Sequence, residues 1–111
     1  MSEQSAAPKG KAFNLANHIE YADGSVVSKT LIQKEIGTIT LFAFDRGQGL
    51  SEHTAPFDAV VHILDGKATI TIGGHPQTVS TGEMLIMPAN ISHALQADEK
   101  FKMLLVMIRS E

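Results

Sequence analysis

Histidine is the residue type in this chain best suited to chemistry, because imidazole binds metals, transfers protons and forms hydrogen bonds near neutral pH. The chain has five histidines and twelve acidic residues but no cysteine. Disulfides, thiolate zinc sites, iron–sulfur clusters and cysteine nucleophiles are therefore excluded. Two histidines, His53 and His93, each end a stretch that begins with glycine, at Gly47 and Gly82. These stretches are the candidate functional segments, although their similarity is too weak to indicate an internal repeat.

Short strands must position these histidines. Residues 67–72 show the pattern most clearly, since Ala68, Ile70 and Ile72 alternate with polar residues and predict one buried face. No segment has a long helical period, and residues 13–19 fit either a helical turn or an edge strand. Strands are predicted over residues 26–35, 38–45, 50–55, 58–65, 67–72, 77–80, 84–87, 92–97 and 101–109. The series predicts an all-β fold, an antiparallel sandwich or barrel.

Glycine and proline mark the connections between these strands. Gly37 predicts a tight connection between two neighbouring antiparallel strands. The pair Pro56-Phe57 predicts a hairpin between the strands on either side of it. Asp65-Gly66 is a favoured pair for a two-residue type I′ turn, and it predicts a second hairpin.

Length and composition limit the function classes. A chain of 111 residues predicts one domain, with a flexible leader over residues 1–12 and a single barrel over residues 13–111. The net charge of −3 gives no source for phosphate binding, so nucleic acid is not expected as a partner. The longest apolar run, residues 103–108, is far below the roughly 20 residues of a membrane helix. With no secretory h-region near the start, the chain is expected to be cytoplasmic.

The first glycine-to-histidine stretch resembles the first motif of the cupins, usually written G-x5-H-x-H-x3-E-x6-G. Gly47, His53, Ala55, Ala59 and Gly66 reproduce every interval of that motif. Both glycines and one histidine are retained, whereas alanine replaces the second histidine and the glutamate.

The second stretch resembles the second cupin motif, G-x5-P-x-G-x2-H-x3-N. Gly82, Pro88, Asn90, His93 and Ala97 occupy its positions, and Asn90, which replaces a glycine, tolerates positive φ. Two motifs in register are far more specific than a single glycine-rich string. The resemblance implies a cupin barrel, an antiparallel double-stranded β-helix of jelly-roll type, and small cupins are commonly homodimers.

In cupins the two histidines and the glutamate of the first motif, with the histidine of the second, bind one metal ion. His53 and His93 match two of these ligands, but Ala55 and Ala59 offer no donor. Two imidazoles alone would hold a divalent ion (Zn, Fe, Ni or Mn) only weakly. Asp58 would complete a set of two histidines and one carboxylate, but strand parity places it on the opposite face from Ala59 unless the strand is bulged.

The favoured hypothesis is therefore a binding protein whose barrel holds a small organic ligand, with the two imidazoles as polar contacts. The predicted pocket residues are His53, Ala55, Phe57, Ala59, His93, Phe42 and Phe44. Phe42 and Phe44 fit the core equally well, and methionines 84, 87, 103 and 107 are interpreted as core filler rather than as a pliable pocket wall. Three alternatives stay open: a metal-dependent dioxygenase or isomerase using His53 and His93, a structural or interaction protein with a filled barrel, and two histidines satisfied by hydrogen bonds or buried water.

Overall fold

The structure is a computed structural model that describes residues 7–109. The predicted strands form over this range, together with one short 3-10 helix, η2 (Ala16–His18). The strands are β1 (Val26–Lys34), β2 (Gly37–Phe44), β3 (Gly49–His53), β4 (Ala59–Asp65), β5 (Lys67–Ile72), β6 (His75–Ser80), β7 (Met84–Met87), β8 (His93–Gln96) and β9 (Phe101–Ile108).

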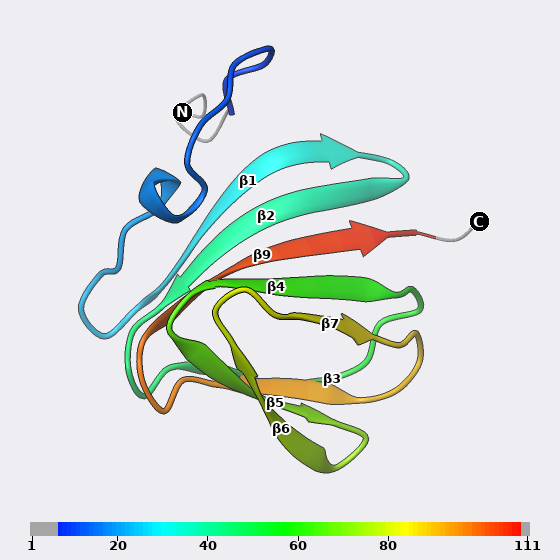
Figure 1. The fold of residues 1–111 in the computed structure, drawn as a ribbon. Coiled ribbons are helices and arrows are strands. Elements are labelled where there is room, and N and C mark those ends of the chain that lie inside the picture. Colours follow the sequence, from blue (N-terminus) through cyan, green and yellow to red (C-terminus); the bar gives the residue numbers. More distant parts are fainter. Residues whose placement is uncertain (1–6, 110–111) are drawn as a thin grey trace.

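The strands form two antiparallel sheets that face each other (Figure 1). One sheet has five strands in the order β1-β2-β9-β4-β7, and the other has four in the order β3-β8-β5-β6. From β2 onward the chain crosses from one sheet to the other at every connection except the one between β5 and β6, as in a jelly roll. The all-β prediction is confirmed. No helix among residues 7–109 is long and apolar enough to cross a membrane.

The space between the sheets is filled by residues that alternate along each strand. In β4, Ala59, Val61 and Ile63 are buried, whereas Val60 and His62 on the opposite face are half-buried, which confirms the predicted parity. In the same sheet, the fully buried rings of Phe44 on β2 and Phe101 on β9 stack with centroids 4.5 Å apart. Part of this buried core also surrounds the candidate site.

Two of the predicted hairpins are wrong. β4 pairs with β7 and β9, and β5 pairs with β6 and β8, so Asp65-Gly66 joins two sheets rather than two paired strands. The segment around Pro56-Phe57 likewise connects β3 in one sheet to β4 in the other. Turn residues indicate where the chain changes direction, whereas the partner of each strand is set by contacts between residues far apart in sequence.

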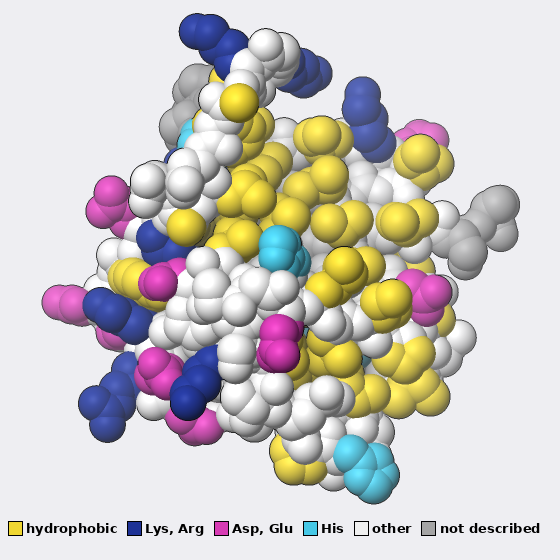
Figure 2. Space-filling view, in the orientation of Figure 1, with side chains coloured by type: hydrophobic (Ala, Val, Ile, Leu, Met, Phe, Trp, Pro, Cys, Tyr) yellow, Lys and Arg dark blue, Asp and Glu magenta, His cyan; other side chains and the backbone are white. Residues whose placement is uncertain are grey.

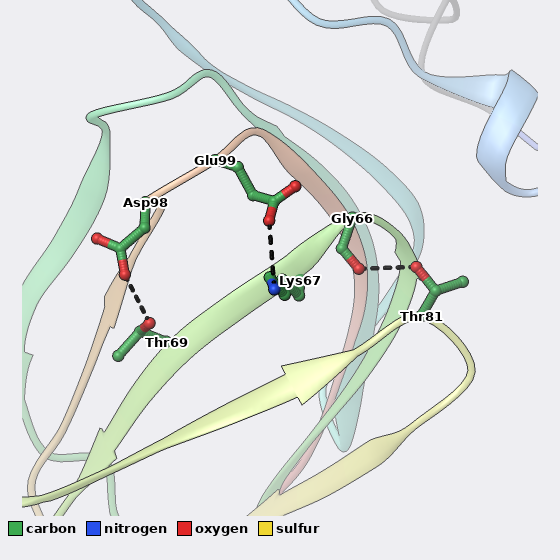
Figure 3. A network of polar contacts seen from close by, with 6 residues as sticks. All are labelled: Gly66, Lys67, Thr69, Thr81, Asp98 and Glu99. Carbon is green, nitrogen blue, oxygen red and sulfur yellow. Dashed lines mark hydrogen bonds and ion pairs between the residues drawn. The ribbon is translucent and has the colours of Figure 1, made fainter.

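Gly66 is the point where the chain crosses between the sheets. Its φ of +72° lies in the left-handed region, and a Cβ there would lie 2.3 Å from the Lys100 carbonyl oxygen. The Gly66 carbonyl accepts a hydrogen bond of 2.7 Å from the Thr81 hydroxyl (Figure 3). Nearby, the Thr69 hydroxyl donates to Asp98 and the Lys67 amino group lies 3.7 Å from the Glu99 carboxylate, so the start of β5 contacts the loop before β9 (Figure 3).

The chain before β1 covers part of the five-stranded sheet. Ile19 packs with Leu41 and Ala43 in a second, smaller buried cluster. Residues 7–12 form no helix or strand, and residues 1–6 of the predicted leader lie outside the described residues, so the flexible leader stays a prediction.

Tyr21 fastens this covering segment to the barrel. Its hydroxyl donates a 2.6 Å hydrogen bond to Asp65, and the amino groups of Lys100 and Lys102 lie 4.8 and 5.0 Å from its ring centre. Burial, followed by the Asp65 carboxylate, raises the pKa of the Tyr21 hydroxyl far above its usual value. The hydroxyl therefore stays protonated in the folded chain throughout the neutral range.

The substitution Tyr21→Phe is expected to lower the free energy of unfolding by about 1 kcal/mol near pH 7, because the hydrogen bond to Asp65 is lost. The difference from wild type should shrink above about pH 10. There the unfolded wild type loses the Tyr21 proton while the folded state retains it, so wild-type stability falls and the Phe variant escapes this loss. Urea denaturation at pH 7 and pH 11 measures both effects, and a constant difference would contradict the assignment.

An aliphatic row crosses the outer face of the five-stranded sheet. Direct cross-strand pairs run without interruption through Ile32, Ile39, Val106, Val60 and Ile86, one from each strand. Paired residues share a face, so these side chains lie side by side. Ile32 is 42% exposed and Ile86 58% exposed. Figure 2 shows hydrophobic side chains gathered over this sheet.

Candidate functional site

His53 and His93 are brought together by strand pairing in the four-stranded sheet. They are 40 residues apart in sequence, yet they are direct cross-strand partners on β3 and β8. Their Nε2 atoms lie 3.1 Å apart, and the rings meet edge to face with centroids 4.4 Å apart. The bulge between Leu50 and His53 adjusts the register so that the two histidines face each other.

The outer nitrogens of the pair are held by the backbone. His53 Nδ1 lies 2.8 Å from the Ser51 carbonyl oxygen, and His93 Nδ1 lies 3.3 Å from the Ile91 carbonyl oxygen. A carbonyl oxygen only accepts, so each Nδ1 must carry a proton to form its bond. These bonds hold the two rings with their Nε2 atoms close together.

Two neutral imidazoles carry fewer protons than the three contacts of the pair require. The two Nδ1 contacts and the Nε2–Nε2 contact require three protons if all are hydrogen bonds, whereas two neutral imidazoles carry only two N–H groups. With both Nδ1 atoms protonated, two Nε2 lone pairs face each other. In this arrangement the two lone pairs can share one proton donor or one cation.

Electrostatics disfavours an extra proton on His93. Burial lowers its pKa, the neighbouring His53 lowers it further, and the hydrogen bond to Ile91 only partly opposes this. The His93 side chain is only 4% exposed, whereas His53 is exposed. His93 therefore offers a neutral imidazole lone pair at the edge of the barrel interior.

A cavity of about 60 Å³ lies next to the pair. Ala55 and Ala59, the alanines at the positions of the missing cupin ligands, form part of its wall. The other wall residues are apolar apart from the two histidines, and the complete lining is Leu50, His53, Ala55, Ala59, Met87, His93, Leu95, Met103, Leu105 and Met107. The cavity thus combines apolar walls with one polar anchor.

The structure brings four of the predicted pocket residues to this cavity, namely His53, Ala55, Ala59 and His93. Phe57 is half-buried and does not line it. Phe42 and Phe44 do not line it either, because they stack with each other and extend the core stack with Phe101. Their placement corrects the prediction that these two rings face the ligand.

Asp58 does not join the histidines. Its carboxylate accepts a 2.9 Å hydrogen bond from the Ala89 amide and so holds the turn after β7. In that turn Asn90 adopts φ +65°, as its place in the motif predicts, and its amide donates to the Ala55 carbonyl. Asp58 therefore supports the cavity wall indirectly, by fixing the turn that contacts Ala55.

The usual cupin metal site does not fit these residues. Within residues 7–109 no group of three or more histidine, cysteine or acidic side chains could hold a metal ion. No carboxylate lies on the cavity wall, and a hard divalent ion prefers oxygen donors. Four-ligand divalent chemistry is therefore not supported by the donors present.

Three of the methionines, which the sequence analysis interpreted as core filler rather than as a pocket wall, line the cavity. Met87 and Met107 are the direct cross-strand neighbours of Ala59, on β7 and β9, and Met103 also reaches the wall. Met87 and Met103 are buried in the core and Met107 packs against it, as predicted, but all three also form part of the cavity wall. For Met87 and Met107 the signal is pairing with Ala59, and this is available only once strand partners are known.

Two facing antiparallel sheets around a cavity with a histidine pair at its edge define a jelly-roll barrel of the cupin type. A family model described as a cupin domain matches residues 40–109, more than half of the chain. The chain belongs to the cupin family.

Solved structures agree with this assignment. A conserved protein of unknown function from Streptococcus pyogenes is 39% identical, with a TM-score of 0.90, over 95% of this chain and 92% of that one. A cupin superfamily protein from Desulfitobacterium hafniense is 31% identical, with a TM-score of 0.87, over 93% and 94% of the two chains. A cupin 2 conserved barrel domain protein from Leptotrichia buccalis is 43% identical, with a TM-score of 0.85, over 87% of this chain but 47% of that one. The comparison with curated proteins found no match.

Proposed function

We propose that this cupin is a binding protein that holds a small organic molecule in the cavity beside His53 and His93. The observation that carries the proposal is the unbalanced proton count of the imidazole pair. A ligand with one O–H or N–H donor supplies the missing proton, and its apolar part contacts the alanine and methionine walls. The ligand class is therefore a small, largely apolar molecule with a single donor.

The cavity sets the size of the ligand. Its volume of about 60 Å³ corresponds to roughly two water molecules, and it is well below the volume of drug-sized pockets. Methionine side chains are flexible, so movement of Met87, Met103 or Met107 would enlarge the space. A ligand of about four non-hydrogen atoms matches the cavity with little movement.

Binding of 2-propanol and acetone, which have the same number of non-hydrogen atoms, tests the donor requirement. Because only 2-propanol donates a hydrogen bond, wild type is expected to bind it at least about tenfold more tightly than acetone. Titrations followed by amide chemical shifts of Ala55 and Ala59 measure both affinities.

The variant His53→Ala is the matched control, because His53 is exposed and its removal leaves the core intact. In this variant the preference for 2-propanol should shrink, since the donor keeps only the lone pair of His93 Nε2 as its acceptor. Equal binding of acetone and 2-propanol by wild type, or the absence of saturable shifts with either, would contradict the proposed ligand class.

We also propose that two copies pair through the aliphatic row. An exposed strip of this kind is unusual on a monomer, and a two-fold axis would place the same row on both sides of the contact. The resemblance to small cupins supports the same arrangement. A second copy would remove Ile32 and Ile86, the two exposed ends of the row, from water.

A further inference from the structure

The methionines around Ala59 give the cavity a second kind of donor. Ala59 on β4 lies between Met87 on β7 and Met107 on β9, and all three line the cavity. Directly opposed side chains in an antiparallel sheet lie on one face, with Cβ atoms about 5 Å apart. Two thioethers therefore flank the position that carries the metal-binding glutamate in the cupin motif.

The imidazole pair is preorganised to share a cation. With metal–nitrogen bonds of about 2.0–2.1 Å, two Nε2 atoms 3.1 Å apart subtend an angle of about 100° at the ion. The backbone carbonyls of Ser51 and Ile91 hold both rings by Nδ1, which leaves both Nε2 lone pairs free for a metal. An angle of this size leaves room for further ligands on the side of the cavity.

The donor types select the metal. Neutral imidazoles and thioethers are the donors available on the wall, with no carboxylate among the residues that line it. Thioether sulfur favours soft ions such as Cu(I) over the hard divalent ions. The apolar surroundings also favour a monovalent ion over a divalent one, because the free-energy cost of moving an ion out of water rises with the square of its charge.

We propose that His53, His93, Met87 and Met107 form a binding site for one Cu(I) ion. This goes beyond the proposed function, since it assigns the same cavity a metal ion. The ion and the organic ligand use the same two lone pairs, so they exclude each other. The difference from the family's usual site is chemical: the imidazole and carboxylate lost at Ala55 and Ala59 are replaced by sulfur donors from the neighbouring strands.

Competition with a coloured Cu(I) chelator under anaerobic conditions tests the site on the full chain. Wild type is expected to bind one Cu(I) per chain and to bind Cu(I) more tightly than Zn(II). The double variant Met87→Leu/Met107→Leu, which conserves side-chain volume, should bind Cu(I) roughly 100-fold more weakly. Met84→Leu is the matched control, because Met84 is 61% exposed on the outer face and should leave the affinity unchanged.

X-ray absorption of the copper-loaded wild type provides a readout that does not depend on any variant folding. We expect sulfur as well as nitrogen neighbours around copper, and the sulfur contribution should be lost in the double variant. Nitrogen neighbours alone, tighter binding of Zn(II) than of Cu(I), or equal Cu(I) affinity in wild type and double variant would each overturn the copper site.

Different experimental results would contradict the two proposals for the cavity. The Met87→Leu/Met107→Leu variant retains both imidazoles, so it should keep the preference for 2-propanol over acetone while its Cu(I) affinity falls. Loss of that preference in the double variant would show that the two substitutions disturb the imidazole pair itself, and a fall in Cu(I) affinity would then be assigned to the imidazoles and not to the thioethers.

Discussion

Gly66→Ala is expected to lower the free energy of unfolding by about 3 kcal/mol, the largest effect we expect from adding a single methyl group to this chain. Two causes add together. The left-handed φ of +72° is unfavourable for alanine, and the new Cβ would lie 2.3 Å from the Lys100 carbonyl oxygen. That oxygen belongs to backbone next to β9, so it cannot move without disturbing the junction between the sheets. Urea denaturation followed by circular dichroism measures the change, because the chain has no tryptophan for fluorescence.

Gly74→Ala separates the two causes. Gly74 also has a positive φ, +85°, but a Cβ there would meet no atom within 4 Å. Only backbone strain acts at this position, so the expected loss is about 1 kcal/mol. If both substitutions lower the free energy of unfolding by the same amount, the close approach to the Lys100 carbonyl contributes nothing to the loss. The role assigned to Gly66, where the chain crosses between the sheets, would then be incorrect.

Ile86→Lys is expected to convert the proposed homodimer into a monomer. At a two-fold interface the substitution places two lysines in the contact, and burying their charges should weaken association by about 100-fold or more. The folded chain should be unaffected, because the Ile86 side chain is 58% exposed on the edge strand β7. Sedimentation velocity at micromolar concentration distinguishes twice the 11.9 kDa chain mass from the single mass.

Thr78→Lys provides a charge-matched control on β6, in the other sheet. This exposed residue lies away from the aliphatic row, so the variant should stay dimeric. A wild type that sediments as a monomer, or a Thr78→Lys variant that dissociates as readily as Ile86→Lys, would show that the row is not the interface.

The imidazole pair and the aliphatic row lie in different sheets, so the two sets of experiments are independent. The histidines belong to β3 and β8, whereas the row crosses β1, β2, β9, β4 and β7. β4, β7 and β9 link them, because each carries a cavity residue (Ala59, Met87 or Met107) next to a residue of the row (Val60, Ile86 or Val106). A change in ligand binding on dimer dissociation would therefore have to pass through these three strands.

Local patterns in the sequence determined the strands and their faces. Alternation placed Ala59, Val61 and Ile63 inside, and the intervals from Gly47 to Ala97 identified His53 and His93 as corresponding positions of two motifs. Alternation has a period of two, and it depends only on residues close in sequence. The absence of donors at Ala55 and Ala59 could likewise be read directly from the chain.

Tertiary structure decided which strands are partners, and through this it decided the chemistry of the cavity. Pairing with Ala59 made Met87 and Met107 wall residues, and the turn after β7 drew Asp58 to the Ala89 amide instead of to the histidines. Strand pairing depends on long-range contacts and on register, which periodicity along one strand does not encode. The positions of the imidazoles were thus predictable from the sequence, whereas the donors that surround them were set only by the assembled sheets.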